Sequence, residues 1–375
     1  MDRELALNIV RVTEAAALGC AKFLGRGDKE IADQAAVDGM RSMFQVLDVS
    51  GTVVIGEGEM DEAPMLYIGE RIGRCCDGNP EIDIAVDPLD GTNLVAKGLP
   101  NAISVVAVAP KGCLLHAPDM YMDKIAAGPK GVGVIDINAP LQTNIRNLAK
   151  SLGKDISEIT VVMLDRPRHQ EYIDIVRRVG ARVKLYNDGD VATAISTCFQ
   201  DSGIDLMIGK GGAPEGVIAA AAIKCLGGEF QGILAPENEE QKQRCLDMGL
   251  ERVDKVLTME DLAKGDDIIF AATGVSDGDL LKGVRYYSNN RAKTYSMVTR
   301  SKSGTIRFID TIHTFDKKPK YAYWLNLKIG CFWCFILHEY KVLRNILMFF
   351  LPVYHAIYFY YNITKFIIYY YKFLC

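Results

Sequence analysis

Two acidic residues at a spacing of three, Asp87 and Asp90, stand in the segment Asp87-Pro-Leu-Asp-Gly-Thr92. The apolar run 82–86 predicts a buried strand that delivers Asp87 to its carboxyl end. The proline and glycine of the segment favour a tight turn, which would aim Asp90 back beside Asp87. Two carboxylates this close repel one another unless a divalent cation lies between them. The hydroxyl of Thr92, at the start of the next helix, suits contact with a phosphate or orientation of a water. An ordinary Asp-Gly turn is the alternative.

Two further acids occupy comparable positions. Glu57 lies in the segment Gly56–Glu59 directly after a predicted strand at 52–55, and the glycines on both sides of it leave the backbone open to a ligand. Glu215 lies in the glycine-rich segment 211–216, which is expected to join a strand near 204–208 to a helix. Glu215 could instead serve only the dipole of that helix, and the acids after Glu57 could form a solvated loop.

Polar clusters follow two more predicted strands. Arg166-Pro167-Arg168 follows a strand near 159–163, and Asp188-Gly189-Asp190 follows a strand near 181–186. Paired guanidinium groups suit phosphate or several sugar oxygens. Because the carboxyl ends of strands gather at one edge of a sheet, these clusters together indicate a divalent-metal site with a phosphate ligand.

The elements that must position these residues alternate between strand and helix, which predicts an α/β fold. Helices are expected over about 5–23 and from about Lys29, and Asp33 lies on the apolar stripe of the second. Other expected elements are a strand near 102–109 and helices near 168–179, 190–199 and 214–226. The stretch 268–310 has more strand than helix and is expected to close a second unit.

Composition places the chain among ordinary globular proteins. The chain has 375 residues, of which 49% are hydrophobic and 24% charged. A net charge of −4 argues against binding to nucleic acid. Seven of the ten cysteines precede residue 320 and no signal peptide opens the chain, so free thiols in a reducing compartment are expected. Residues 1–320 are expected to form two packed α/β subdomains, with a boundary near 140–160 and the site between them.

Residues 321–375 differ from the rest. They hold five Lys/Arg and one acid, Glu339, and 19 of the 33 aromatic residues. The run 345–364 contains no Lys, Arg, Asp or Glu, and a segment of this length can cross a bilayer. The tail's composition favours translated non-coding sequence, and a genuine membrane anchor is the rival interpretation.

Several other functions are disfavoured. The glycine spacing after the strand near 204–208 fails the dinucleotide fingerprint, and no Walker A sequence occurs. A haloacid-dehalogenase phosphatase would need its two acids two positions apart, whereas Asp87 and Asp90 are three apart. A non-catalytic, metal-dependent protein that binds sugar phosphates would need a broken site, and all the acids are present.

The strand-end motifs resemble those of the lithium-sensitive, metal-dependent sugar and inositol phosphatases, and most closely class II fructose-1,6-bisphosphatases of the GlpX type. The resemblance runs from Met1 to about His313. It rests on Asp87–Thr92, on 211–216 and on the following motifs: Gly25-Arg-Gly-Asp-Lys29, Val54-Ile-Gly-Glu-Gly-Glu59-Met-Asp-Glu-Ala-Pro64 and Ala117-Pro-Asp-Met-Tyr-Met122. Leu89-Asp90 and Met163-Leu-Asp-Arg-Pro-Arg-His169 resemble the photosynthetic branch, which also acts on sedoheptulose-1,7-bisphosphate.

The resemblance implies a layered αβαβα sandwich and a set of site residues. Asp33 and Glu57 match the ligands of one metal, Mg²⁺ or Mn²⁺, and Asp87, Asp90 and Glu215 match those of a second. Thr92, assisted by Glu57 and Asp61, would orient the attacking water. The positions that match substrate contacts are Asp90, Gly91, Thr92, Tyr121, Arg166, Pro167, Arg168, Asp188, Gly189, Asp190 and Gly212.

The implied reaction is hydrolysis of the 1-phosphate of fructose-1,6-bisphosphate, in gluconeogenesis or the reductive pentose phosphate (Calvin) cycle. Another sugar or inositol phosphate is the alternative substrate. The resemblance further implies a homodimer or homotetramer. A cytoplasmic location is expected, with the plastid stroma as the alternative, and membrane contact only if 321–375 is a genuine segment.

Overall fold

The computed structural model describes residues 1, 3–58, 65–247 and 252–318. Contacts divide the chain into one unit over Met1–Tyr323 and another over Trp324–Cys375. The tail and its uncharged run 345–364 therefore lie outside the described residues, as does Asp61.

The first part of the chain builds two helices and then half of one sheet. Its elements are α1 (Leu5–Cys20), α2 (Lys29–Phe44), β1 (Ser50–Ile55), β2 (Arg71–Ile72), β3 (Glu81–Asp90), α3 (Thr92–Lys97) and β4 (Ile103–Pro110). The expected break between the helices is present, and Asp28 caps α2 by accepting a hydrogen bond from the Ile31 N–H at 3.1 Å.

The middle and end of the chain build a second sheet and then return to the first. The middle elements are β5 (Tyr121–Ala127), α4 (Leu141–Leu152), β6 (Thr160–Leu164), α5 (Gln170–Val179), β7 (Arg182–Tyr186), α6 (Asp190–Ser196), β8 (Leu206–Gly212), α7 (Ala213–Leu226), β9 (Glu229–Leu234), α8 (Glu239–Asp247) and α9 (Met259–Leu262). The last are β10 (Ile269–Gly274), β11 (Arg285–Tyr287), β12 (Arg291–Arg300) and β13 (Thr305–Thr314).

The strands form two sheets. The first has eight strands in the order β11-β12-β10-β4-β3-β1-β2, with β13 also paired to β12, and the second has the order β7-β6-β8-β5-β9. The expectation that 268–310 closes the second unit is wrong, because β10 pairs antiparallel with β4 of the first sheet. Both of these strands are buried along almost their whole length, so each needs a partner on either side. A subdomain boundary near 140–160 stays a prediction.

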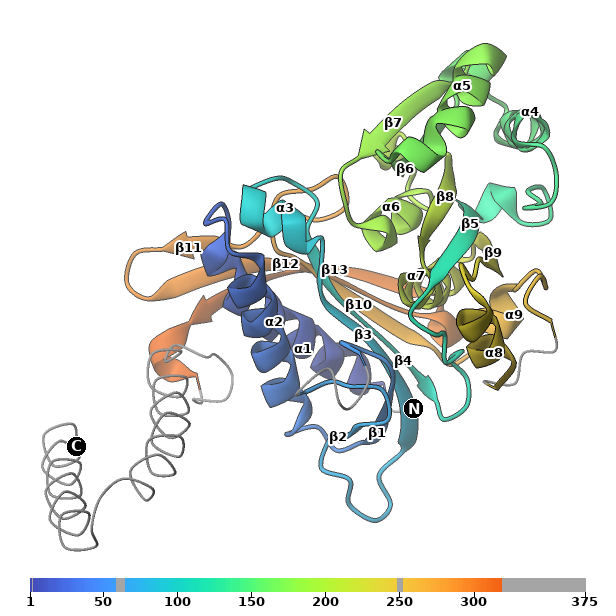
Figure 1. The fold of residues 1–375 in the computed structure, drawn as a ribbon. Coiled ribbons are helices and arrows are strands. Elements are labelled where there is room, and N and C mark those ends of the chain that lie inside the picture. Colours follow the sequence, from blue (N-terminus) through green and yellow to red (C-terminus); the bar gives the residue numbers. More distant parts are fainter. Residues whose placement is uncertain (2, 59–64, 248–251, 319–375) are drawn as a thin grey trace, which may run out of the picture. The chain divides into compact units, whose positions relative to one another are not determined.

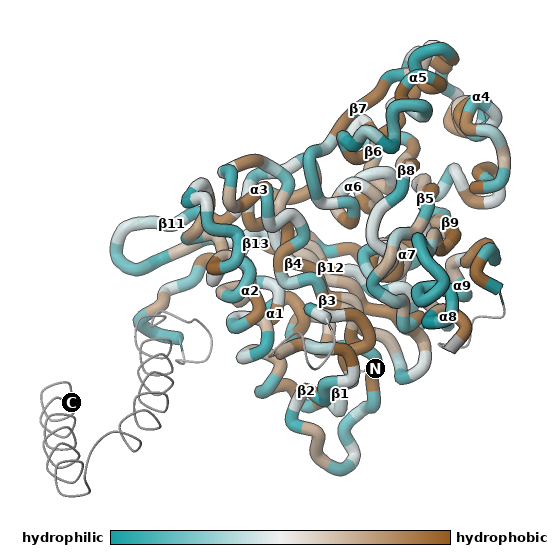
Figure 2. The backbone as a smooth tube through the Cα atoms, in the orientation of Figure 1, coloured by the Kyte–Doolittle hydropathy of each residue, from teal (hydrophilic) through white to brown (hydrophobic). Residues whose placement is uncertain are grey.

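The helices and sheets form five layers, and three hydrophobic cores fill the spaces between them (Figure 1). Helices α1 and α2 pack on one face of the first sheet. Its other face packs against α7, which together with α6 also covers the inner face of the second sheet. Helices α4 and α5 cover the outer face of that sheet. The expected αβαβα sandwich is therefore observed, and Figure 2 shows hydrophobic residues along the strands of the first sheet and a largely hydrophilic α8.

Two local expectations need correction. No tight turn follows Asp87: β3 continues to Asp90, and its register with β4 shifts between these two residues. Pro88 has no N–H to donate to the ladder, so the strand bulges there, and the chain turns only at Gly91, whose φ is 98°. In the segment 211–216, β8 runs to Gly212 and α7 begins at the next residue, so no loop intervenes.

Two findings concern the chain's environment. All seven described cysteines are free thiols, as expected. Across the described residues, no helix combines the length and the apolar character needed to cross a membrane.

Candidate active site

A cavity of about 580 Å³ brings together the acids expected to bind metal. Its lining includes Asp33, Glu57, Asp87, Asp90 and Glu215. These residues come from α2, the residues after β1, the end of β3 and the first turn of α7. Four of the five acids follow the ends of strands, as expected, and the fifth, Asp33, is the charged residue on the apolar stripe of α2.

The backbone holds several of these acids in place. The Glu57 N–H donates to the Leu66 carbonyl at 3.0 Å, which fixes the chain just after β1. Asp87 Oδ1 accepts from the Leu89 N–H at 3.0 Å across the bulge of β3. Glu215 lies in the first turn of α7, where the helix dipole favours its charge.

The electrostatics of the cavity oppose ionisation of all five acids. Burial raises the pKa of Glu57 to about 8, and the neighbouring Asp33 and Glu215 add to this shift. Burial and neighbouring carboxylates also hold the pKa values of Asp87 and Asp90 well above their usual range. The pKa values of Asp33 and Glu215 are raised too, chiefly by burial. Lys29 is the one basic residue in the described lining of the cavity, so most of the positive charge that its acids need is missing.

The residues present suit a divalent cation. Asp90 Oδ2 and Glu215 Oε2 are buried and, within the described part of the chain, have no hydrogen-bond partner. Carboxylate oxygens without protein partners are the ligands that Mg²⁺ and Mn²⁺ prefer. No three His, Cys, Asp or Glu side chains among the described residues have the arrangement of a preformed metal site. The donor chemistry therefore fits, and the division of the five acids between two ions stays a prediction.

Thr92, the expected catalytic hydroxyl, lines the same cavity at the start of α3. Its Oγ1 donates to the Leu89 carbonyl at 3.4 Å, a long hydrogen bond that leaves the hydroxyl free to turn towards a ligand. Gly91 also lines the cavity. The third expected catalytic residue, Asp61, lies outside the described residues.

Some of the expected substrate contacts lie beside this cavity. Asp188 lines it and also lines a smaller cavity of about 340 Å³, together with Arg166. Arg166 Nη2 lies 3.5 Å from Asp188 Oδ1, and Asn93 Nδ2 donates to Asp188 Oδ2 at 3.1 Å. The shared residues Asn93 and Asp188 make the two cavities neighbours, so a ligand with two charged ends could occupy both.

The remaining expected contacts stand outside the lining of these two cavities. They are Tyr121, Pro167, Arg168, Gly189, Asp190 and Gly212. The Arg168 guanidinium lies 4.9 Å from the centre of the Tyr121 ring and donates through Nε and Nη2 to the Lys210 carbonyl. Gly212 is the partner of Tyr121 in the β5–β8 pairing. Tyr121, Arg168 and Gly212 thus lie together, and the substrate role of all six residues stays a prediction.

Sequence reasoning gave no role to three residues that the structure places at or behind the site. Lys29 and Asp119 line the main cavity, although both belong to motifs that carry the family resemblance. Lys124 in β5 is 2% exposed, and its Nζ contacts Asp190 Oδ2 at 2.6 Å. The signal for Lys124 was a charged pair, Asp123-Lys124, beside an apolar run, but β5 itself was not predicted.

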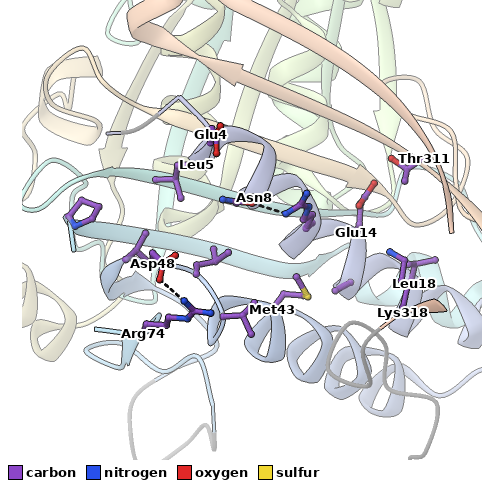
Figure 3. A pocket seen from close by; sticks show the side chains of 16 residues that line it. Glu4, Leu5, Asn8, Glu14, Leu18, Met43, Asp48, Arg74, Thr311 and Lys318 are labelled. Carbon is purple, nitrogen blue, oxygen red and sulfur yellow. Dashed lines mark hydrogen bonds and ion pairs between the residues drawn. The ribbon is translucent and has the colours of Figure 1, made fainter. Parts of the chain in front are cut away.

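A larger cavity, of about 700 Å³, contains none of the expected site residues (Figure 3). Figure 3 shows the Glu14 carboxylate directed towards Thr311 of β13. The charged residues of its lining are three acids and three bases, Glu4, Glu14, Asp48, Arg11, Arg74 and Lys318. This balance gives the cavity no preference for a ligand of either charge.

Comparison with known proteins identifies the family. Residues 3–313 match the model for "Bacterial fructose-1,6-bisphosphatase, glpX-encoded". The chain belongs to this family. It is 49% identical over 331 residues to fructose-1,6-bisphosphatase 1 class 2 of Escherichia coli K12, which covers 85% of this chain and 97% of the relative. Class 2 fructose-1,6-bisphosphatases of E. coli O6:H1 and Shigella flexneri match to the same extent.

Membership of this family agrees with the chemistry of the cavity. The family consists of metal-dependent phosphatases, and the acids described above are the oxygen donors that such enzymes require. The match ends at residue 313, close to the end of β13. The tail 321–375 thus lies beyond the region that the family shares.

Proposed function

We propose that the protein hydrolyses the 1-phosphate of fructose-1,6-bisphosphate to fructose-6-phosphate and phosphate, with Mg²⁺ or Mn²⁺ as cofactor. One observation carries the proposal: five acids and Thr92 line a single cavity in a member of this family, and two of the acids hold buried oxygens without described partners. Asp33 and Glu57 would hold one ion, and Asp87, Asp90 and Glu215 the other.

The chain's own residues account for most of the chemistry. The cations would supply Lewis acidity and countercharge for the phosphate oxygens. Thr92, with Glu57 and Asp61, would orient a water in line with the bond that breaks, which joins phosphorus to the sugar oxygen. That oxygen leaves with the sugar and takes up a proton. Arg166 and Arg168 would bind the distal phosphate, because guanidinium groups pair with phosphate in a forked geometry.

The finer assignments belong to the same proposal. The Leu89-Asp90 variant supports a second activity on sedoheptulose-1,7-bisphosphate, and therefore a role in the reductive pentose phosphate cycle beside gluconeogenesis. A homo-oligomer is proposed from the family resemblance. A cytoplasmic location is proposed from the bacterial relatives, with the plastid stroma as the alternative.

The test is phosphate release by the full chain from each bisphosphate, with Mg²⁺, with Mn²⁺ and with chelator. Metal-dependent release that disappears in Glu57→Ala is expected. Glu239→Gln serves as the matched control, because this acid lies on α8 with 87% of its side chain exposed. No release from a folded, metal-loaded protein would overturn the proposal.

The same assay separates the two alternatives. Release from other sugar or inositol phosphates, but from neither bisphosphate, would establish a different substrate. Binding of fructose-1,6-bisphosphate by calorimetry without release would instead establish a non-catalytic binding protein.

A further inference from the structure

Strands β6 and β8 of the second sheet separate before they end. They run parallel, and within the described residues their pairing is confined to 161–162 with 206–207. Both strands nevertheless continue, β6 to Leu164 and β8 to Gly212. The chain leaves β6 towards α5 on the outer face of this sheet and leaves β8 directly into α7 on the inner face. In an open α/β sheet, a ligand crevice forms where neighbouring strands lead to opposite faces in this way.

The imidazole ring of His169 fills the gap between these two strands. Its Nδ1 lies 2.8 Å from the carbonyl oxygen of Leu164 at the end of β6. Its Nε2 accepts a hydrogen bond from the Lys210 N–H of β8, also at 2.8 Å. If the register of the two strands continued, the Lys210 N–H would donate directly to the Leu164 carbonyl. The ring therefore replaces one hydrogen bond of the ladder with two, and so holds the strands apart.

The gap suits a neutral histidine in a single tautomer. The His169 ring is 1% exposed, and a Cβ added at Gly209 would lie 3.0 Å from its Cε1, so glycine leaves room for the ring. Because the Lys210 N–H can only donate, Nε2 carries no hydrogen, and the hydrogen lies on Nδ1 and is donated to the Leu164 carbonyl. Burial and the adjacent Arg168 lower the pKa of His169, which favours this neutral form.

Lys210 also fixes the direction of Arg168. The N–H and C=O of one strand residue point to the same side, so both backbone groups of Lys210 face the gap. Its carbonyl accepts from Arg168 Nε at 3.1 Å and from Nη2 at 2.7 Å, and Tyr121 stacks on the guanidinium. These contacts occupy one edge and one face of the guanidinium. The other edge, which includes Nη1, is left to pair with a phosphate in a forked geometry.

We propose that His169 is a positioning residue for the distal phosphate of the substrate: by bridging Leu164 and Lys210, it holds the crevice open and aims Arg168. The inference rests on the proposed function, in which Arg166 and Arg168 bind that phosphate. His169 belongs to the lining of neither the main cavity nor its smaller neighbour. Its effect therefore passes through Lys210 and Arg168, not through contact with the reacting atoms.

The first test compares two substrates that differ only in the distal phosphate. His169→Phe keeps a planar ring in the gap but removes both hydrogen bonds. It should lower kcat/KM for fructose-1,6-bisphosphate about 10-fold to 100-fold, mainly through KM, because Arg168 is no longer held towards the phosphate. With fructose-1-phosphate, which lacks that phosphate, kcat/KM should fall less than about 3-fold.

Two further variants control for damage to the fold. His169→Gln retains one donor and one acceptor on a side chain of similar reach, so it should recover part of the lost bisphosphate activity. His313→Phe is the matched control, because this histidine is also 1% exposed but lies in β13 and lines neither cavity. It should leave the ratio of the two kcat/KM values unchanged.

A double-mutant cycle tests the route through Arg168. Arg168→Ala alone should lower kcat/KM for the bisphosphate, and His169→Phe should add little in that background. An equal further loss would show that the ring acts independently of Arg168, and would overturn the inference.

A measurement of the ring itself does not depend on catalysis. NMR of histidine-labelled protein at about pH 7 should show one ring with its hydrogen on Nδ1, and this signal should disappear in His169→Phe. The Lys210 amide should exchange its hydrogen slowly in the wild type and faster in His169→Phe. A hydrogen on Nε2 of His169 would overturn the inference whatever the activity.

The results also separate this inference from the proposed function. A wild type that releases phosphate from neither substrate would overturn both. A wild type active on the bisphosphate, with His169→Phe either unimpaired or equally impaired on both substrates, would overturn the positioning role alone.

Discussion

Gly212→Ala tests whether the position of the Glu215 carboxylate controls the reaction, without changing any charge. Gly212 has φ −64° and ψ 140°, which any residue adopts, so alanine introduces no backbone strain. An added Cβ, however, would lie 1.9 Å from Glu215 Oε2 and 2.7 Å from its Cδ. The substitution therefore acts on one side chain.

The size of the effect follows from these distances. A Cβ atom does not approach within 3.0 Å of an oxygen, so the carboxylate must move by at least about 1 Å. A flexible side chain makes such a move for about 0.5–1.5 kcal/mol, and the melting temperature should fall by only a few degrees. Near the reacting atoms a 1 Å displacement can lower the rate about 100-fold. Turnover should therefore fall about 100-fold in a protein that is still folded.

A double-mutant cycle decides whether the effect passes through Glu215. Phosphate release and Mg²⁺ affinity are measured for the wild type, Gly212→Ala, Glu215→Ala and the double variant. In the Glu215→Ala background the added alanine should cost little. Wild-type turnover in Gly212→Ala would refute the reasoning. An equal loss in both backgrounds would instead show that the methyl group acts elsewhere, for example on the substrate.

Three further predictions follow from the site. Lys124→Met leaves the buried Asp190 without its partner and should lower the free energy of unfolding, measured in urea, by about 3–5 kcal/mol. Lys124→Met/Asp190→Asn should recover most of this stability, and an equal loss in the double variant would contradict the prediction. Thr92→Ala should lower kcat about 100-fold with little change in substrate affinity, and unchanged turnover would remove Thr92 from the mechanism. Without metal, the free energy of unfolding should fall as the pH rises from about 4.5 to 8, because Glu57 keeps a proton in the folded protein that it has lost in the unfolded chain. One such proton lowers the free energy of unfolding by about 1.4 kcal/mol per pH unit. Mg²⁺ should flatten this slope, and a metal-free melting temperature that rises with pH over that window would be the contrary result.

The sequence predicted the cavity acids well because each leaves a local signal. Glu57 and Asp87 end or follow apolar runs, and the αβαβα layers bring those ends together. Asp33 was recognisable because a charged residue on the apolar stripe of a helix requires a partner. These signals depend on a few adjacent residues, so they survive without knowledge of the tertiary structure.

The misplaced elements depend on contacts between distant parts of the chain. β10 belongs to the first sheet because its neighbour is β4, about 160 residues earlier, and no local pattern specifies that pairing. β5 escaped prediction because Asp123 and Lys124 interrupt its apolar run, although Lys124 is buried through its pair with Asp190. The bulge at Pro88 was mistaken for a turn because proline is common in both.

The position of Lys124 explains how the fold tolerates so many acids without disabling them. Its ammonium group contacts Asp190 and lowers the pKa of Glu215 only from a distance. None of the ion pairs between described residues involves the five cavity acids themselves. A lysine in direct contact with those acids would satisfy their oxygens and compete with a divalent cation for them. Because Lys124 contacts Asp190 and not these acids, it offsets part of their repulsion and leaves the ligand oxygens available. Removal of Lys124 should therefore destabilise the metal-free protein more than the metal-loaded protein.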